Sequence, residues 1–167
     1  MKQLWAPWRM SYICGEDGDA RRGCIFCLRD LAAEDPERLV VHRGTHAFVI
    51  MNRYPYSNGH LMVAPYRHTA ELAELDVAEV LEMHHLLLRA KAALHRTMSP
   101  QGFNLGMNLG QVAGAGVADH LHLHLVPRWQ GDTNFMPVLA EVRSIPQHLE
   151  ESYRIICSAF KTESGVG

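Results

Sequence analysis

The pattern of apolar and polar positions first indicates strands. Residues 38–68 contain two apolar runs, at 46–52 and 60–65, and the segment 54–59 between them is rich in Pro, Asn and Gly. Short apolar runs separated by turn-forming residues are typical of β-strands joined by a loop. This part of the chain is therefore predicted to form strands of a sheet.

The period then changes to that of a helix. Residues 69–99 carry leucine and valine at helical spacing, which predicts a long amphipathic helix. Thr69 and Asp76 are each followed closely by glutamate, so two helix starts with acidic first turns are expected. Ser99 with the following proline, and then Gly102, end the helical pattern.

Apolar and polar residues alternate again in the last third of the chain, as in a β-strand. Residues 103–110 alternate, 111–119 form a loop of small residues, and 120–127 read as the last clear strand. A closing helix is expected at 146–161. Strands, one long helix, a further strand pair and a second helix predict an α+β fold with an antiparallel sheet.

Length and composition narrow the class of protein. A chain of 167 residues fits one domain, so residues 1–167 are expected to form a single unit. A formal net charge of −2 argues against a general nucleic-acid-binding protein. No signal peptide or membrane-spanning stretch is evident, so the four cysteines are read as reduced thiols of a cytoplasmic protein.

Three histidines occupy alternate positions in the segment "DHLHLHLVPRW", residues 119–129. Because strand side chains alternate between faces, His120, His122 and His124 are expected on one face, about 6.5–7 Å apart along the strand. The cluster allows three interpretations: an ordinary polar strand face, a metal site, or a nucleophile. A neutral imidazole attacks phosphorus readily near pH 7 and can leave again, which makes it suited to nucleotidyl transfer.

Small residues precede these histidines. Gly110, Gly114 and Gly116 let backbone N–H groups approach an anion closely, although a flexible turn is the plainer interpretation of any single glycine. The run "GAGVAD" lacks the third glycine of a dinucleotide-binding fingerprint and precedes a strand, so that interpretation is rejected.

A second cluster of reactive residues is the pair Cys24 and Cys27, in the spacing C-x-x-C. A redox pair would need a following helix in a βαβ unit, which is not evident. Two buried thiols and half of a zinc site remain as alternatives.

The chain resembles the histidine-triad (HIT) family of nucleotide hydrolases and transferases. The resemblance is carried by "HLHLHLVP" and by "FVIMNRYPYSNGHLMVAPYRH", which is similar to the upstream strand pair of the family. The segments "LWAPWR" and "PRWQGDTNF" resemble the branch that contains diadenosine tetraphosphate phosphorylases. The resemblance implies a HIT-like fold with about five antiparallel strands, a homodimer, and no organic cofactor.

The same resemblance implies roles for individual residues. His122 would attack the α-phosphorus of a nucleotide, and His124 would bind the phosphate and assist the leaving group. Asn52 would face the ribose, and Asn108 with the glycines after it would line the phosphate path. Many members carry Gln or Ser four residues before the first histidine, where this chain has Gly116, so any role of that side chain must be absent here or taken by backbone N–H groups.

The resemblance also completes the metal site. His68 follows the second predicted strand and His120 begins the triad strand, as in members of the family that carry a C-x-x-C. Cys24, Cys27, His68 and His120 are therefore expected to hold structural zinc, which would anchor the segment 14–30 and leave His122 free.

The predicted function is nucleotidyl transfer or hydrolysis on a dinucleoside polyphosphate such as diadenosine tetraphosphate, with inorganic phosphate favoured over water as the acceptor. The alternatives are a nucleoside phosphoramidate or adenylyl hydrolase, and a zinc-stabilised nucleotide-binding protein with weak activity. His60 is interpreted as a structural residue near the sugar pocket.

Overall fold

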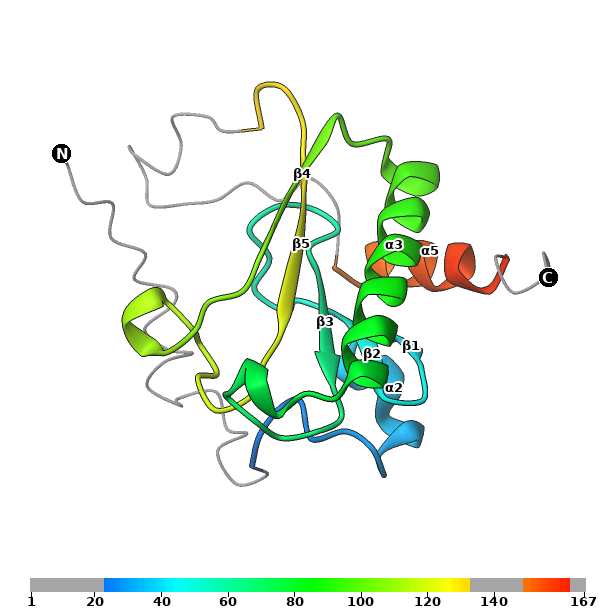
Figure 1. Cartoon of the computed structure of the whole chain (residues 1–167). Helices are drawn as coiled ribbons and strands as arrows, with labels where there is room; N and C mark the ends of the chain where they lie inside the picture. The colour runs from blue at the N-terminus through cyan, green and yellow to red at the C-terminus, as the bar shows by residue number, and fades with distance from the viewer. Residues whose placement is uncertain (1–22, 133–148, 163–167) are drawn as a thin grey trace, which may run out of the picture.

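The protein forms an α+β fold around one antiparallel sheet, as predicted (Figure 1). A computed structural model describes residues 23–132 and 149–162. Its five strands are β1 (Val40–Arg43), β2 (Ala47–Met51), β3 (Leu61–Pro65), β4 (Gly102–Gly106) and β5 (Leu123–Arg128). They lie in the order β1-β2-β3-β5-β4, and every neighbouring pair is antiparallel.

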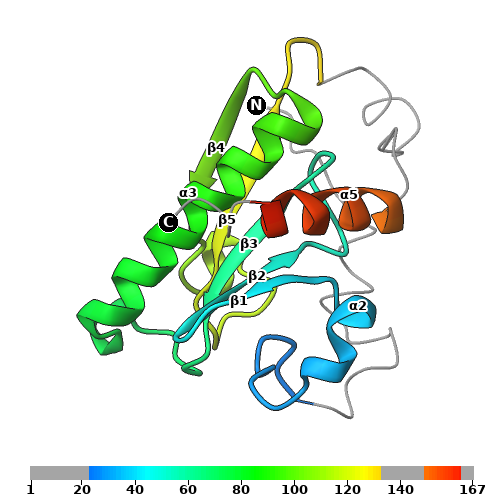
Figure 2. The ribbon, with the colours of Figure 1, turned by 90° about the vertical axis from the view of Figure 1, so that its right-hand side faces the viewer.

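The helices are α2 (Asp35–Arg38), α3 (Val77–Met98) and α5 (Leu149–Thr162), with 3-10 turns η1 (Ala32–Glu34), η2 (Leu72–Glu74) and η3 (Gln111–Ala113). Figure 2 shows α3 and α5 packed on the same side of the sheet. No helix of residues 23–132 and 149–162 has the length and hydropathy needed to cross a bilayer.

Both faces of the central strands are covered, which explains why β2 and β3 are buried at every position. Alternate side chains of a strand point to opposite faces. Val49 and Val63 pack beneath α3 and α5 in one core cluster. Phe48 and Met62 pack on the opposite face in a second cluster, together with Phe26 of the N-terminal segment. The segment that contains Phe26 and Leu28 therefore covers the sheet face that α3 and α5 leave free.

The long helix begins at one of the two predicted starts. Asp76 caps α3 in a capping box, because its side chain accepts from the N–H of Glu79 and the Glu79 side chain accepts from the N–H of Asp76. Thr69 instead stabilises a turn, since its hydroxyl accepts from the N–H of Glu71 at 3.0 Å. The predicted helix start at Thr69 is wrong, and only the short turn η2 forms before Asp76.

The triad strand is shorter than predicted. Its ladder with β3 ends at the pair Val63 and Leu123, so His120 and His122 precede the regular strand. Two positions beyond Val63, the ladder would need a hydrogen bond from Pro65 of β3. Proline has no N–H to donate, so the ladder cannot continue there. The N–H of Leu121 donates to the carbonyl of Thr69 at 2.8 Å instead. The expected strand at 119–127 is corrected to Leu123–Arg128.

Several predictions fall on residues outside the described ranges. These are the motif at 4–9, residues 14–22 of the expected metal-binding segment, the end of the motif at 127–135, and the first turn of the predicted closing helix. That residues 1–167 form one domain stays a prediction.

Candidate active site and metal cluster

The middle histidine of the triad is held in one tautomer. The Nδ1 atom of His122 lies 2.8 Å from the carbonyl oxygen of His120. A carbonyl only accepts, so Nδ1 carries the proton and donates. In the neutral ring the lone pair is then on Nε2. Burial lowers the pKa of His122, which favours this neutral form.

His124 is oriented by a chain of hydrogen bonds that starts at the backbone. The N–H of Tyr56 donates to Nδ1 of His60 at 3.1 Å, so the proton of a neutral His60 is on Nε2. That Nε2 lies 2.9 Å from Nδ1 of His124 and donates to it. The neutral His124 ring therefore carries its own proton on Nε2, as a hydrogen-bond donor.

The fold brings these groups together across the sheet. His124 pairs with Met62 in the β3–β5 ladder and so lies on the face opposite α3 and α5. His60 precedes β3 at the end of a tight turn, where Gly59 has a φ of +72°. A Cβ at this glycine would lie 2.8 Å from a methyl carbon of Leu94 on α3, so a larger residue would displace the loop from the helix.

Asn52, which was expected to face a ribose, contacts its own loop. Its Oδ1 accepts from the N–H of Tyr54 at 2.9 Å, and its Nδ2 lies 3.3 Å from Nδ1 of His60. Its contact with a ribose stays a prediction.

The predicted phosphate loop is closed by one of its own side chains. Asn108 Nδ2 donates to the carbonyl of Gly114 at 3.3 Å. Gly114 adopts a left-handed conformation, with a φ of +87°, and ends the turn η3. Gly116 is exposed in the following bend. Contacts of these residues with a nucleotide stay predictions.

The four predicted metal ligands converge. The ligand atoms of Cys24, Cys27, His68 and His120 lie within 4.8 Å of one another. Three sulfur–nitrogen contacts join the pairs: Cys24 to His120 and Cys27 to His68 are both 3.4 Å, and Cys27 to His120 is 3.9 Å. The two Nδ1 atoms are 3.2 Å apart. Ligand atoms at about 2.0–2.3 Å from a tetrahedral zinc ion would lie about 3.3–3.8 Å from one another. The donor set fits a closed Cys2His2 site, and the shorter separations match those around a tetrahedral zinc ion.

His120 presents its ligand nitrogen because its other nitrogen is bonded elsewhere. Its Nε2 donates to the carbonyl of Pro65 at 2.9 Å, which leaves the lone pair of Nδ1 facing the cysteines. Burial, together with the nearby Cys27 thiol, raises the pKa of Cys24 to about 11. A divalent metal ion would supply the positive charge needed to ionise this thiol.

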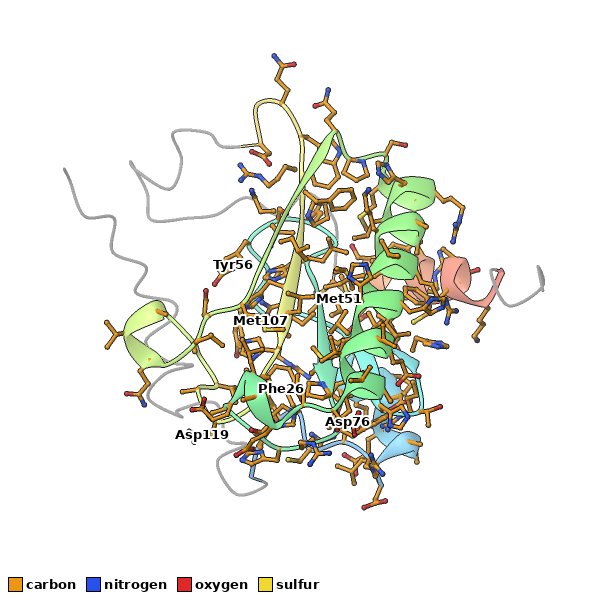
Figure 3. The ribbon with its side chains drawn as sticks, viewed as in Figure 1. Phe26, Met51, Tyr56, Asp76, Met107 and Asp119 are labelled. Carbon is orange, nitrogen blue, oxygen red and sulfur yellow. The ribbon has the colours of Figure 1, made fainter. Side chains whose placement is uncertain are left out.

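Two aromatic contacts and the hydrogen bond between His60 and His124 were missed by the sequence interpretation. The Phe26 ring stacks on His122, with centroids 4.8 Å apart, and Tyr56 stacks on His60 at 4.8 Å. Figure 3 shows Tyr56 above Phe26 beside the sheet. His60, interpreted from the sequence as a structural residue near the sugar pocket, is fully buried and donates directly to a triad histidine. The only sequence signal was the Gly59-His60 pair.

Comparison with known proteins identifies the family. A model of the HIT domain matches residues 33–131. The chain belongs to the histidine-triad family. The predicted family and fold are thus confirmed, and with them the assignment to the nucleotide hydrolases and phosphorylases of this family.

Relatives of this HIT protein include an AP-4-A phosphorylase of Mycobacterium tuberculosis, 37% identical over 163 residues, which are 95% of this chain and 84% of the relative. A zinc-bound histidine triad family protein from Mycobacterium smegmatis is 26% identical, with a TM-score of 0.64 over 85% of this chain and 96% of that structure. A hypothetical histidine triad nucleotide-binding protein from Sulfolobus tokodaii shares the fold, with a TM-score of 0.63 and 24% identity over 83% of this chain and 93% of that one.

Proposed function

We propose that this HIT protein is a phosphorylase of dinucleoside polyphosphates such as diadenosine tetraphosphate, acting through a nucleotidyl adduct on His122. The observation that carries the proposal is the bond from Nδ1 of His122 to the carbonyl of His120, because it leaves a lone pair on Nε2. The substrate class is supported by the mycobacterial relative named AP-4-A phosphorylase.

In the first step, Nε2 of His122 attacks the α-phosphorus of the bound nucleotide. A bond forms between Nε2 and phosphorus, and the bond from phosphorus to the bridging oxygen breaks, with its electron pair leaving on that oxygen. From diadenosine tetraphosphate the leaving group is ATP. The Nε2 proton of His124 is proposed to hydrogen-bond the departing oxygen, because Nδ1 of that ring accepts from His60.

In the second step, an acceptor attacks the adenylyl group on His122. Phosphate yields ADP, and water yields AMP. Asn52 is proposed to hold the ribose, and Asn108, Gly114 and Gly116 to line the phosphate path. The lack of a side chain at Gly116 would leave space for a phosphate ion that a larger residue would fill, which is why phosphate is the favoured acceptor.

The cluster of Cys24, Cys27, His68 and His120 is proposed to hold a structural zinc ion. A bound zinc ion would link the turn that carries Cys24 and Cys27 to the residues that precede β5. The proposal includes no organic cofactor. Among the described residues, Cys24, Cys27 and Cys157 form no disulfide, which suits a reducing compartment such as the cytoplasm.

A homodimer is part of the proposal. Strand β4 is an edge strand of the sheet, and Leu105 on it is 56% exposed. No other strand of residues 23–132 and 149–162 pairs with this edge, and an edge with an exposed leucine is a suitable surface for a second copy. Sedimentation of the purified protein checks this, and a monomer at micromolar concentration would contradict it.

The test of the reaction is product analysis with diadenosine tetraphosphate, with and without inorganic phosphate. We expect ATP and ADP in the presence of phosphate, and no products from His122→Asn. AMP that persists at millimolar phosphate would make the protein a hydrolase. Cleavage of adenylyl phosphoramidates without cleavage of the tetraphosphate would change the substrate class, and binding without turnover would favour a nucleotide-binding protein.

A further inference from the structure

The nucleophile stacks on an aromatic ring that comes from the metal cluster. Phe26 lies between the two cysteines of the C-x-x-C, in a turn closed by the N–H of Cys27 donating to the carbonyl of Cys24 at 3.1 Å. The cysteines point to the cluster, while the Phe26 side chain, 1% exposed, points into the protein. One short turn thus contributes two of the four candidate metal ligands and also an aromatic side chain.

The Phe26 ring contacts two histidines with different predicted roles. Its centroid lies 4.8 Å from that of His122, with the planes inclined by 28°, so the two rings are stacked. It lies 5.4 Å from His120 at a tilt of 51°. Phe26 therefore links the metal cluster to the nucleophile by direct contact.

This stacking completes the restraint on the His122 ring. The hydrogen bond to the His120 carbonyl fixes one atom of the imidazole but still allows the ring to swing about that bond. Phe26 covers one face, and the ring of His124 approaches at 4.9 Å and 76°. Together these contacts fix the ring plane, and hence the direction in which Nε2 points, which an in-line attack requires.

The Phe26 ring also affects the charge that His122 gains during the reaction. When Nε2 of His122 bonds to phosphorus, Nδ1 keeps its proton, so the imidazole ring acquires positive charge. The face of a phenyl ring carries negative potential and attracts a cation placed over it. The charge therefore develops against a buried aromatic face, where it is poorly screened by water.

We propose that Phe26 is a positioning residue for the nucleophile, holding the plane of His122 and stabilising the charge that this ring gains as the adduct forms. The inference rests on the proposed function, because it concerns the same adduct. It assigns to the C-x-x-C turn a part in the reaction rate that is separate from its part in stability.

Replacement of Phe26 by pentafluorophenylalanine tests this with little change of shape, because fluorine withdraws the negative charge from the ring face. The matched control is the same replacement at Phe48, which is also fully buried, belongs to the same cluster, and packs 5.2 Å from Tyr66. The readouts are the single-turnover rate of adduct formation, the nucleotide dissociation constant and the thermal midpoint.

We expect the Phe26 variant to form the adduct about 10- to 30-fold more slowly, with an unchanged dissociation constant. The Phe48 control should keep the wild-type rate, and Phe26→Leu, which also loses the flat contact surface, should be slower still. An unchanged rate in the fluorinated Phe26 variant, or equal losses at both positions, would overturn this inference alone. A wild-type protein that forms no adduct would overturn the proposed function, and this inference with it.

Discussion

The buried His60 should control the rate of the reaction through the tautomer of His124. In the structure, His60 accepts from the N–H of Tyr56 at 3.1 Å and donates to His124 at 2.9 Å. His60→Leu keeps an apolar side chain of similar size but removes both bonds. The Nε2 proton of His124 is then no longer specified, because its Nδ1 has lost the donor that kept it unprotonated.

The expected effect has two parts. The N–H of Tyr56 and Nδ1 of His124, both partly buried, lose the partner shown at about 1–3 kcal/mol each, so the free energy of unfolding should fall by about 2–6 kcal/mol. Loss of a correctly placed proton donor typically costs about 10²–10⁴ in rate, so kcat should fall by about that factor. His60→Gln is the matched control, since its amide has a donor and an acceptor with spacing similar to that of the imidazole nitrogens.

The assay is steady-state turnover of diadenosine tetraphosphate at a temperature where all variants are folded. His60→Gln should recover at least tenfold of the activity lost in His60→Leu. In a double-mutant cycle, His60→Leu should add little to the loss caused by His124→Ala, because both remove the same proton donor. A His60→Leu protein with kcat within about threefold of wild type would refute the reasoning.

Two further predictions concern the metal and the pH dependence of stability. Purified protein should contain about one zinc per chain. Removal of the zinc by a chelator, or replacement of Cys24 and Cys27 with serine, should lower the thermal midpoint by ~10 °C, whereas the control Cys157→Ser should retain the metal. Metal-free protein with an unchanged thermal midpoint would contradict the proposed zinc site. Burial raises the pKa of Glu82, but bonds from three backbone N–H groups of the β1–β2 turn outweigh it and hold the pKa below its usual value. A lowered pKa means stability that is present above the unfolded-state pKa and lost as pH falls through the folded one. Glu82→Gln should therefore lose about 1 kcal/mol at pH 7 and converge with wild type in acid, by denaturant melts at several pH values; a constant difference across that range would count against this.

Much of the fold could be predicted because its local patterns agree with its packing. The apolar runs at 46–52 and 60–65 became β2 and β3, and the acidic pair that starts at Asp76 became a capping box. The start of β5 could not be predicted from alternation, because it depends on Pro65, a residue of the neighbouring strand.

The convergence of the four candidate metal ligands was predictable, whereas the hydrogen bond from His60 to His124 was not. C-x-x-C spacing indicates a metal half-site, and the family resemblance supplied His68 and His120, all of which the fold brings together. His60 and His124 are 64 residues apart and meet only through the register of β3 against β5. Periodicity along one segment contains no information about that register.

The central claim is that His122 becomes covalently nucleotidylated. The most direct measurement is rapid alkaline denaturation of the enzyme during turnover of diadenosine tetraphosphate without phosphate, followed by proteolysis and mass spectrometry of the peptide that carries the triad. The account predicts an adenylyl group on His122, absent from His122→Asn and removed from wild type by added phosphate, with ADP released. Turnover with no adduct, or an adenylyl group on His124, would contradict it.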